Sequence, residues 1–183
     1  MTHETQPSLK YSYREYACFP NDGFRHEIID GEHYMSPAPS TNHQRVSRKI
    51  QFPLYDQIEL KKLGEVFNAP TDVELAMHDI VQPDLVVVLE SQTHIITPKK
   101  IKSIPNLVIE ILSESNPQHD LILKFEMYQR SGVPEYWIVD PDEQTVQQYF
   151  FVDGRYIDPG KYHDRIASKT IVGVAVDLTD AAH

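Results

Sequence analysis

The sequence is poor in cysteine, glycine and positive charge, and it has no long apolar run. One cysteine, Cys18, occurs in 183 residues, so no internal disulfide can form, and we expect a reducing compartment, the cytoplasm. The longest apolar stretches, such as residues 85–89, are far shorter than the roughly 20 residues that cross a bilayer, which argues against membrane insertion. None of the seven glycines precedes a Lys-Ser or Lys-Thr pair, which excludes a phosphate-binding glycine loop.

The shortage of positive charge limits the classes of partner. Lys and Arg total 17 against 27 Asp and Glu, a net charge of −10, whereas a protein that coats nucleic acid non-specifically usually has the opposite sign. An enzyme that meets phosphate through a bound divalent cation is still compatible with this count, because the ion adds positive charge that the residues do not show.

The composition, 40% hydrophobic and 24% charged, fits one globular domain. Residues 1–10 are polar and without periodicity, and we expect a flexible lead there. No repeat, low-complexity tract or linker divides residues 11–183, which we expect to form a single domain.

Turn and capping signals divide the chain into helices and strands. Ser12 with Glu15 predicts a short helix that ends before Pro20, and Asp30-Gly31 predicts a tight hairpin turn. A long helix is expected from Ser40 or Thr41 to about Leu63, kinked or divided at Pro53, with Gly64 as its left-handed terminator. A later helix is expected between Asn116-Pro117 and Gly132. Strands are expected at 26–29, 32–35, 65–68, 72–76, 84–89, 107–112, 135–139 and 145–152.

This mixed order predicts an α/β or α+β fold, a mixed sheet flanked by helices. Residues 84–89 and 107–112 are apolar on both faces, so their strands should be central.

Two acidic residues interrupt these central strands. Glu110 lies within an apolar strand, and Asp84 stands at the head of another. A buried carboxylate without compensation is costly, so each must be paired, protonated or bound to a cation. Two acids converging from adjacent strands, with a backbone carbonyl, would suit Mg²⁺ or Mn²⁺ rather than zinc. The alternative is that Asp84 is a strand-end cap and Glu110 belongs to a structural ion pair.

Lys124 supplies a third candidate. On a helical wheel it lies at the edge of the apolar face formed by Leu121, Phe125 and Tyr128, so it can point towards the sheet. An ammonium beside a metal could stabilise charge on a phosphoryl group or orient a water. The alternative is a surface lysine paired with Asp120.

Other catalytic patterns have less support. Ser113, Ser115 and Cys18 lack the local context of a nucleophile. Tyr136 and Trp137 fit a core better than a base-stacking platform.

With Asp84, Glu110 and Lys124 in place, the chain resembles the Uma-two family of endonucleases, within the PD-(D/E)xK superfamily of restriction-endonuclease-like folds. The resemblance runs from about residue 24 to 178 and also includes His43, Asp120, Lys124 and Tyr128. Its blocks are EIIDGE at 27–32, SPAPS at 36–40, VQPDL at 81–85, VIEILS at 108–113 and SGVPEYWIVDP at 131–141.

The resemblance implies a restriction-endonuclease-like fold with Asp84 and Glu110 as metal ligands and the carbonyl of Ile111 as a third. The superfamily lysine normally stands two residues after the second acid, where this chain has Leu112. The family takes its lysine from the following helix instead, and Lys124 fits. Glu32, His43 and Tyr128 are implied as supporting residues.

The leading hypothesis is therefore a Mg²⁺- or Mn²⁺-dependent endonuclease that hydrolyses DNA phosphodiester bonds. One alternative is a catalytically inactive nuclease-fold module that mediates DNA or protein interaction, which the net charge favours. Another is a metal-dependent hydrolase of a different phosphate ester.

Two expectations concern the surface. A homodimer is expected from the family resemblance and from an apolar hairpin carrying Val146, Tyr149 and Phe151. A basic rim for DNA is expected from Lys99, Lys100, Lys102, Arg45, Arg48 and Lys49, together with Lys124.

Overall fold

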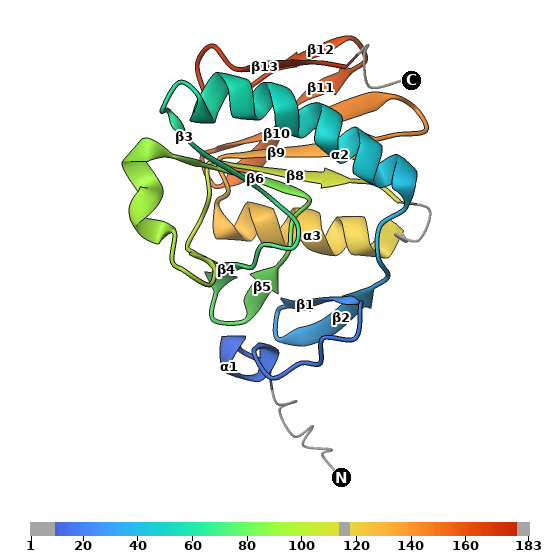
Figure 1. Ribbon diagram of the computed structural model, residues 1–183, viewed down its shortest axis with the longest axis vertical. Helices are drawn as coiled ribbons and strands as arrows, with labels where there is room; N and C mark the ends of the chain where they lie inside the picture. The colour runs from blue at the N-terminus through green and yellow to red at the C-terminus, as the bar shows by residue number, and fades with distance from the viewer. Residues whose placement is uncertain (1–9, 114–117, 179–183) are drawn as a thin grey trace.

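A computed structural model describes residues 10–113 and 118–178 (Figure 1). The flexible lead predicted for residues 1–10 falls outside the described residues apart from Lys10, as do Asn116 and Pro117. The helical segments are α1 (Tyr13–Tyr16), α2 (Thr41–Leu54), the π-helix η1 (Tyr55–Glu59), the 3-10 helix η2 (Glu90–Ile95) and α3 (Gln118–Ser131). None of these helices is long and apolar enough to cross a membrane, a finding that covers the described residues only.

The strands form three sheets. The larger sheet has the order β11-β10-β9-β8-β6-β3, built from β3 (Gly64–Asn68), β6 (Leu85–Leu89), β8 (Leu107–Ile111), β9 (Glu135–Asp140), β10 (Thr145–Val152) and β11 (Arg155–Tyr162). The second has the order β2-β1-β5-β4-β7, from β1 (Arg25–Ile29), β2 (Glu32–Ser36), β4 (Val73–Ala76), β5 (Asp79–Val81) and β7 (Ile101–Lys102). A two-stranded sheet pairs β12 (Arg165–Ala167) with β13 (Ala175–Asp177).

The six-stranded sheet is covered on both faces. Helix α2 and the β12-β13 sheet lie over one face, and α3 lies over the other, between this sheet and β1, β4 and β5 (Figure 1). Val46, Ile50 and Leu54 of α2 pack on one face of β6, β8 and β9, while Met127 and Tyr128 of α3 pack on the opposite face. Strands β6 and β8 are buried on both sides because alternate residues serve the two cores. The predicted mixed fold with flanking helices is confirmed.

Local signals placed the first two elements correctly. Ser12 and Glu15 form a complete capping box at α1. Asp30 and Gly31 have φ values of 50° and 81° and close the β1-β2 hairpin, as expected for a primed turn.

The end of the long helix differs from the prediction. After Pro53, which lacks an N–H, the chain widens into η1, where the N–H of Leu60 bonds the carbonyl of Tyr55 at 3.2 Å. Lys62, with φ of 57°, takes the left-handed conformation expected of Gly64. Gly64 instead begins β3, where an added Cβ would lie 2.3 Å from the carbonyl oxygen of Val88. Its glycine is needed for close strand approach and not for helix termination.

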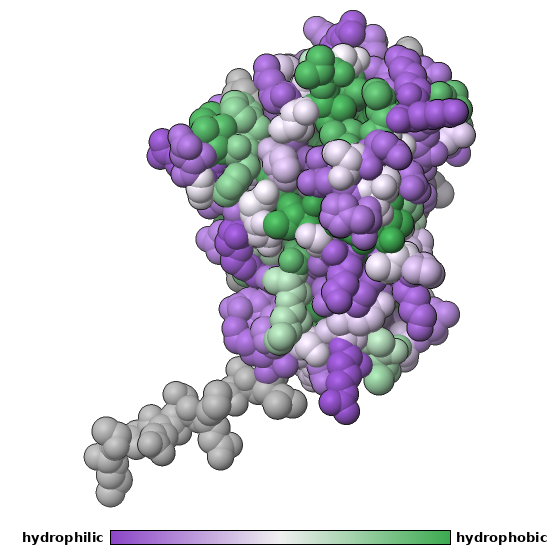
Figure 2. Space-filling view, turned by 90° about the vertical axis from the view of Figure 1, so that its left-hand side faces the viewer, coloured by the Kyte–Doolittle hydropathy of each residue, from purple (hydrophilic) through white to green (hydrophobic). Residues whose placement is uncertain are grey.

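The apolar hairpin behind the homodimer expectation faces inward. Val146 is buried, and Tyr149 and Phe151 are partly buried against Tyr156 and its neighbours. The rings of Tyr149 and Phe151 complete the core under α3, so this hairpin offers no apolar surface that supports a homodimer. The face shown in Figure 2 mixes hydrophobic with hydrophilic groups.

Candidate functional site

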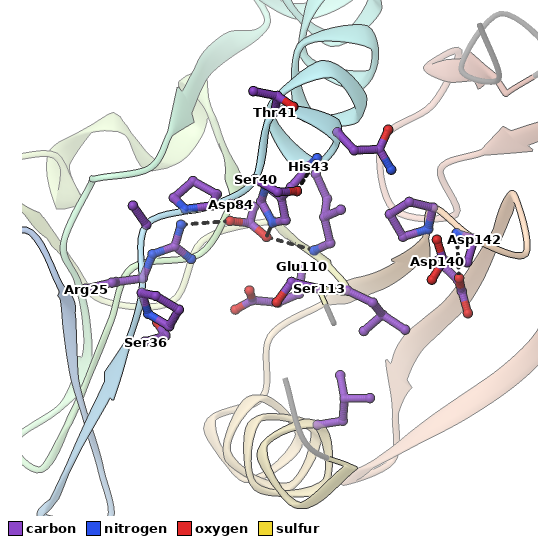
Figure 3. Close-up of a pocket in the computed structure, with 18 of the residues that line it drawn as sticks. Arg25, Ser36, Ser40, Thr41, His43, Asp84, Glu110, Ser113, Asp140 and Asp142 are labelled. Atoms are coloured by element: carbon purple, nitrogen blue, oxygen red, sulfur yellow. Dashed lines mark hydrogen bonds and ion pairs between the residues drawn. The ribbon is translucent and has the colours of Figure 1, made fainter. Parts of the chain in front are cut away.

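A cavity of about 710 Å³ opens where several elements of the fold meet. The start of α2, the β1-β2 hairpin, the end of β8 and helix α3 each contribute side chains to its wall (Figure 3). Strands β6 and β8 are antiparallel neighbours with Leu85 opposite Ile109, so Asp84 and Glu110 come from adjacent strands. Both acids line the cavity, although only 3% of Asp84 and 4% of Glu110 is exposed.

Asp84 is held by three donors. Its Oδ2 accepts hydrogen bonds from His43 Nε2 at 3.0 Å and from the Ile111 N–H at 2.8 Å, and its Oδ1 accepts one from Arg25 Nη2 at 3.0 Å (Figure 3). Burial by itself would raise the pKa of Asp84, but the His43 hydrogen bond and the Arg25 charge outweigh burial and lower that pKa. Asp84 is therefore an anion in the folded protein.

Glu110 has a different environment. Its Oε1 accepts hydrogen bonds from the Tyr128 hydroxyl at 2.6 Å and from Lys124 Nζ at 3.1 Å. Burial raises the pKa of Glu110 to about 7, and the nearby negative charges of Asp84 and Glu27 act in the same direction against Lys124. The two carboxylates thus differ in their tendency to hold a proton.

Lys124 lies inside the protein, with 4% of its side chain exposed. Its Nζ is 3.1 Å from Glu110 Oε1 and 3.0 Å from Glu27 Oε2. Helix α3 delivers this lysine to the sheet because Met127 and Tyr128 bury the same side of the helix. The alternative partner Asp120 has a side chain outside those described.

Glu27 and Arg25 belong to the site but were not predicted as site residues from the sequence. Glu27 binds Lys124 and also accepts a hydrogen bond from the Gln82 N–H at 2.9 Å, so it anchors β1 to the segment before β6. The sequence signal that could have identified them is their spacing. Arg25, Glu27 and Ile29 are two residues apart along β1 and therefore share one face of the strand, and Ile29 is a core residue.

The structure does not bring Glu32 to the cavity. Glu32 is exposed at the start of β2, accepts a hydrogen bond from the Tyr34 hydroxyl at 3.1 Å, and is not among the lining residues. Glu32 pairs with Ile29 at the turn end of the hairpin, whereas Ser36, which pairs with Arg25, lies at the cavity end, and the carboxylate beside Lys124 is that of Glu27.

The expected basic rim is dispersed. Lys100 pairs with Glu74 and lies over the ring of Tyr13, while Arg45 and Arg48 are exposed on α2. Lys124 belongs to the buried network and not to a rim.

The oxygen atoms available in the cavity wall are chemically suited to a hard divalent cation. Carboxylate oxygens of Asp84 and Glu110, with the main chain of Ile111 beside them, are oxygen ligands of the kind that Mg²⁺ and Mn²⁺ prefer. Across the described ranges, no group of three or more His, Cys, Asp or Glu residues is arranged to hold a metal. Any cation here would rely on these two acids and on main-chain oxygen or water.

Comparisons with known proteins agree with this architecture. The sequence model of the Uma2 family, described as "putative restriction endonuclease", matches residues 13–178. A crystal structure from Anabaena variabilis, described as a putative nuclease belonging to DUF820, superimposes with a TM-score of 0.77 at 18% identity, over 94% of this chain and 97% of that one. No curated protein matches the sequence.

Proposed function

Because this chain belongs to the Uma2 family, we propose that it is a metal-dependent endonuclease that hydrolyses phosphodiester bonds in DNA. The observation that carries the proposal is the buried Lys124 ammonium, 3.1 Å from Glu110 at the wall of an open cavity that Asp84 also lines. Three ionisable groups buried at the wall of an open cavity are expensive to maintain, which favours a function for them.

Asp84, Glu110 and the carbonyl of Ile111 would hold the cation. A bound Mg²⁺ or Mn²⁺ would polarise the phosphate and lower the pKa of a coordinated water. His43 and the Ile111 N–H fix the orientation of Asp84, and Tyr128 fixes that of Glu110.

Lys124 would act on the phosphate. Its ammonium can stabilise negative charge that develops on a phosphoryl oxygen, and the ion pair with Glu27 holds it in place. Glu27 itself is a positioning residue in this scheme, since its contacts are with Lys124 and the main chain of Gln82.

Calorimetry and cleavage together test the proposal. We expect Mn²⁺ binding to the wild type and a loss of at least about tenfold in affinity for Asp84→Asn, because a charged ligand becomes neutral. The matched control is Glu65→Gln, an exposed acid on β3 that should bind Mn²⁺ as the wild type does. Cleavage of plasmid and oligonucleotide DNA in Mn²⁺ should likewise be reduced in Asp84→Asn and unchanged in Glu65→Gln.

Two other functions correspond to distinct outcomes. The net charge of −10 favours a catalytically inactive module for DNA or protein interaction. Oligonucleotide binding without Mn²⁺ binding or cleavage would support that module. Cleavage of small phosphodiesters but of no DNA would support a hydrolase of another phosphate ester.

A further inference from the structure

We propose that Arg25 is a ligand for the substrate phosphate, and that Asp84 holds its guanidinium until a divalent cation takes its place. This inference rests on the proposed function. It adds a substrate-binding residue and a coupling between cation and phosphate that the metal ligands alone do not supply.

The three hydrogen-bond donors of Asp84 differ in their freedom to move. Oδ2 is bonded by the Ile111 main chain and by His43, two donors that are buried and fixed by β8 and α2. Oδ1 is bonded by Arg25, whose long side chain is 15% exposed and lines the cavity. Of the donors that bind Asp84 in the described structure, Arg25 is the one with room to move.

The charge of Arg25 is incompatible with a cation on the same oxygen of Asp84. A cation bound at Oδ1 would meet the guanidinium Nη2, which lies 3.0 Å from that oxygen. A cation about 2.1 Å from the same oxygen would lie within about 5 Å of Nη2, and two positive groups this close repel each other in a partly buried site. Arg25 must therefore leave Oδ1 when the cation binds.

The cavity offers space into which the side chain of Arg25 can rotate. Arg25 pairs with Ser36 in the β1-β2 ladder, so its backbone is fixed while its side chain can turn. The wall beside it includes Ser36, Ser40 and Thr41, and the cavity has a volume of about 710 Å³ (Figure 3). A guanidinium turned into this space offers paired N–H groups, which match two oxygens of a phosphate.

Lys124, unlike Arg25, cannot leave its partners easily. Its ammonium contacts both Glu27 and Glu110 and is 4% exposed, so moving it would leave two buried carboxylates without their cation. The two cations therefore divide the work: Lys124 stays in place, and Arg25 exchanges partners.

The exchange couples two binding events. If the cation frees Arg25 for phosphate, then by linkage phosphate that holds Arg25 away from Asp84 must strengthen cation binding by the same factor. Because of Arg25, the protein would bind DNA weakly without the cation and more tightly when the cation is bound.

The experiment measures binding by the full chain and does not depend on turnover. Mn²⁺ affinity is measured by calorimetry, and affinity for a phosphodiester oligonucleotide is measured in Ca²⁺ across a salt series, in the wild type and in Arg25→Gln, Arg25→Lys and Asp84→Asn. The control is Arg155→Gln, which removes an exposed charge on β11. Thermal unfolding checks that every variant is folded.

Arg25→Gln should bind Mn²⁺ more tightly, by roughly tenfold, since the competing charge is gone. Its oligonucleotide affinity in Ca²⁺ should fall, and the salt slope should decrease by about one unit, the value of one phosphate contact. Arg25→Lys keeps the charge and should leave Mn²⁺ affinity near the wild-type value while losing part of the oligonucleotide affinity.

Other results would overturn the inference in distinguishable ways. Unchanged or weaker Mn²⁺ binding in Arg25→Gln, with binding still lost in Asp84→Asn, would reject the role of Arg25 and leave the metal site standing. An unchanged salt slope in Arg25→Gln would reject the phosphate contact. No Mn²⁺ binding by the wild type or Arg25→Gln would overturn the proposed function and this inference together.

Discussion

Lys124 is the residue on which the buried charges of the site depend. It stands between Glu27 and Glu110, at 3.0 Å and 3.1 Å, and all three side chains are almost inaccessible. Removing one partner of such a group leaves the others buried and uncompensated, which typically costs about 3 to 5 kcal/mol. Stability and activity should therefore both respond to substitution here.

The first prediction is the effect of Lys124→Met. Cleavage in Mn²⁺ should fall on the order of 10²-fold or more, because the methionine cannot stabilise phosphoryl charge. The destabilisation should be smaller at pH 5 than at pH 8, since Glu110, whose pKa is raised to about 7, is protonated and neutral at pH 5. Urea denaturation at both pH values, with cleavage measured well below the melting temperature, checks both effects.

Lys61→Met, at an exposed position after η1, is the control for Lys124→Met and should change neither quantity. Wild-type cleavage by a folded Lys124→Met protein would exclude a catalytic role for this ammonium.

The second prediction concerns pH. Burial raises the pKa of Glu110 to about 7 from an ordinary value of 4.5, so the folded chain keeps a proton that the unfolded chain releases between these values. The stabilisation is fully present below pH 4.5 and is lost as pH rises through 7. Without divalent ions, the free energy of unfolding should fall across this window by about 3 kcal/mol from this group.

Urea denaturation at pH 5, 6, 7 and 8 in EDTA measures this fall. Glu110→Gln cannot ionise and should show a flatter dependence, whereas Glu65→Gln, the exposed control, should follow the wild type. Parallel curves for the wild type and Glu110→Gln would contradict the raised pKa.

Strand β9 carries a buried carboxylate that lies outside the site, that of Glu135. Glu135 is fully buried and accepts hydrogen bonds from Trp137 Nε1 at 2.6 Å and Gln148 Nε2 at 2.7 Å within the sheet. It also accepts bonds from the Ser168 hydroxyl and from the N–H and hydroxyl of Thr170. This carboxylate ties the segment between β12 and β13 to the main sheet, and its lone pairs are satisfied by protein donors.

The third prediction is that Glu135→Gln destabilises the fold by about 3 to 5 kcal/mol, roughly the sum of two hydrogen bonds to a charged acceptor, without changing Mn²⁺ affinity. The amide would present an N–H group to donors that need an acceptor, so several hydrogen bonds would be lost together. Chemical denaturation measures the change, with Glu65→Gln on the same sheet as control. A stability equal to that of the wild type would mean that the donors find other acceptors.

Charge over the protein as a whole opposes contact with a polyanion. The net charge is −10, Lys124 is buried, and Lys100 is paired with Glu74. The exposed cations Arg45 and Arg48 lie on α2, the helix whose first turn lines the cavity. Few phosphate contacts are therefore available.

The fourth prediction follows from this distribution. DNA binding should be weak without divalent ions, should increase in Ca²⁺, and should decrease with salt along a shallow slope. Filter binding across a salt series, with Ca²⁺ or EDTA, measures these quantities. Arg45→Gln combined with Arg48→Gln should weaken binding further, and a steep slope that persists in this double variant would place the phosphate contacts elsewhere.

Homodimer formation stays a prediction as well. The β10 side chains that suggested it are in the core, while Phe52, Tyr55 and Leu60 along α2 and the segment after it are exposed. Light scattering at micromolar concentration should show a mass twice that of the chain. A single monomer mass would contradict the dimer.

Features that depend on neighbouring residues could be predicted from the sequence. The Ser12 capping box, the Asp30-Gly31 hairpin and the doubly buried strands follow from local capping, turn geometry and apolar runs. Asp84 and Glu110 were found because a charge within an apolar strand is anomalous wherever the strand lies. Wheel geometry likewise gave the correct direction for Lys124.

Features that depend on residues distant in sequence required the tertiary fold. Arg25 and Glu27 reach the site because β1 packs beside α3, and Glu32 does not because it lies at the turn end of β2, away from the end where Ser36 lines the cavity. The acceptor role of Glu135 depends on residues more than 30 positions away. Local propensity cannot encode such pairings, since a strand's partners and its facing helix are selected by the energy of the assembled core.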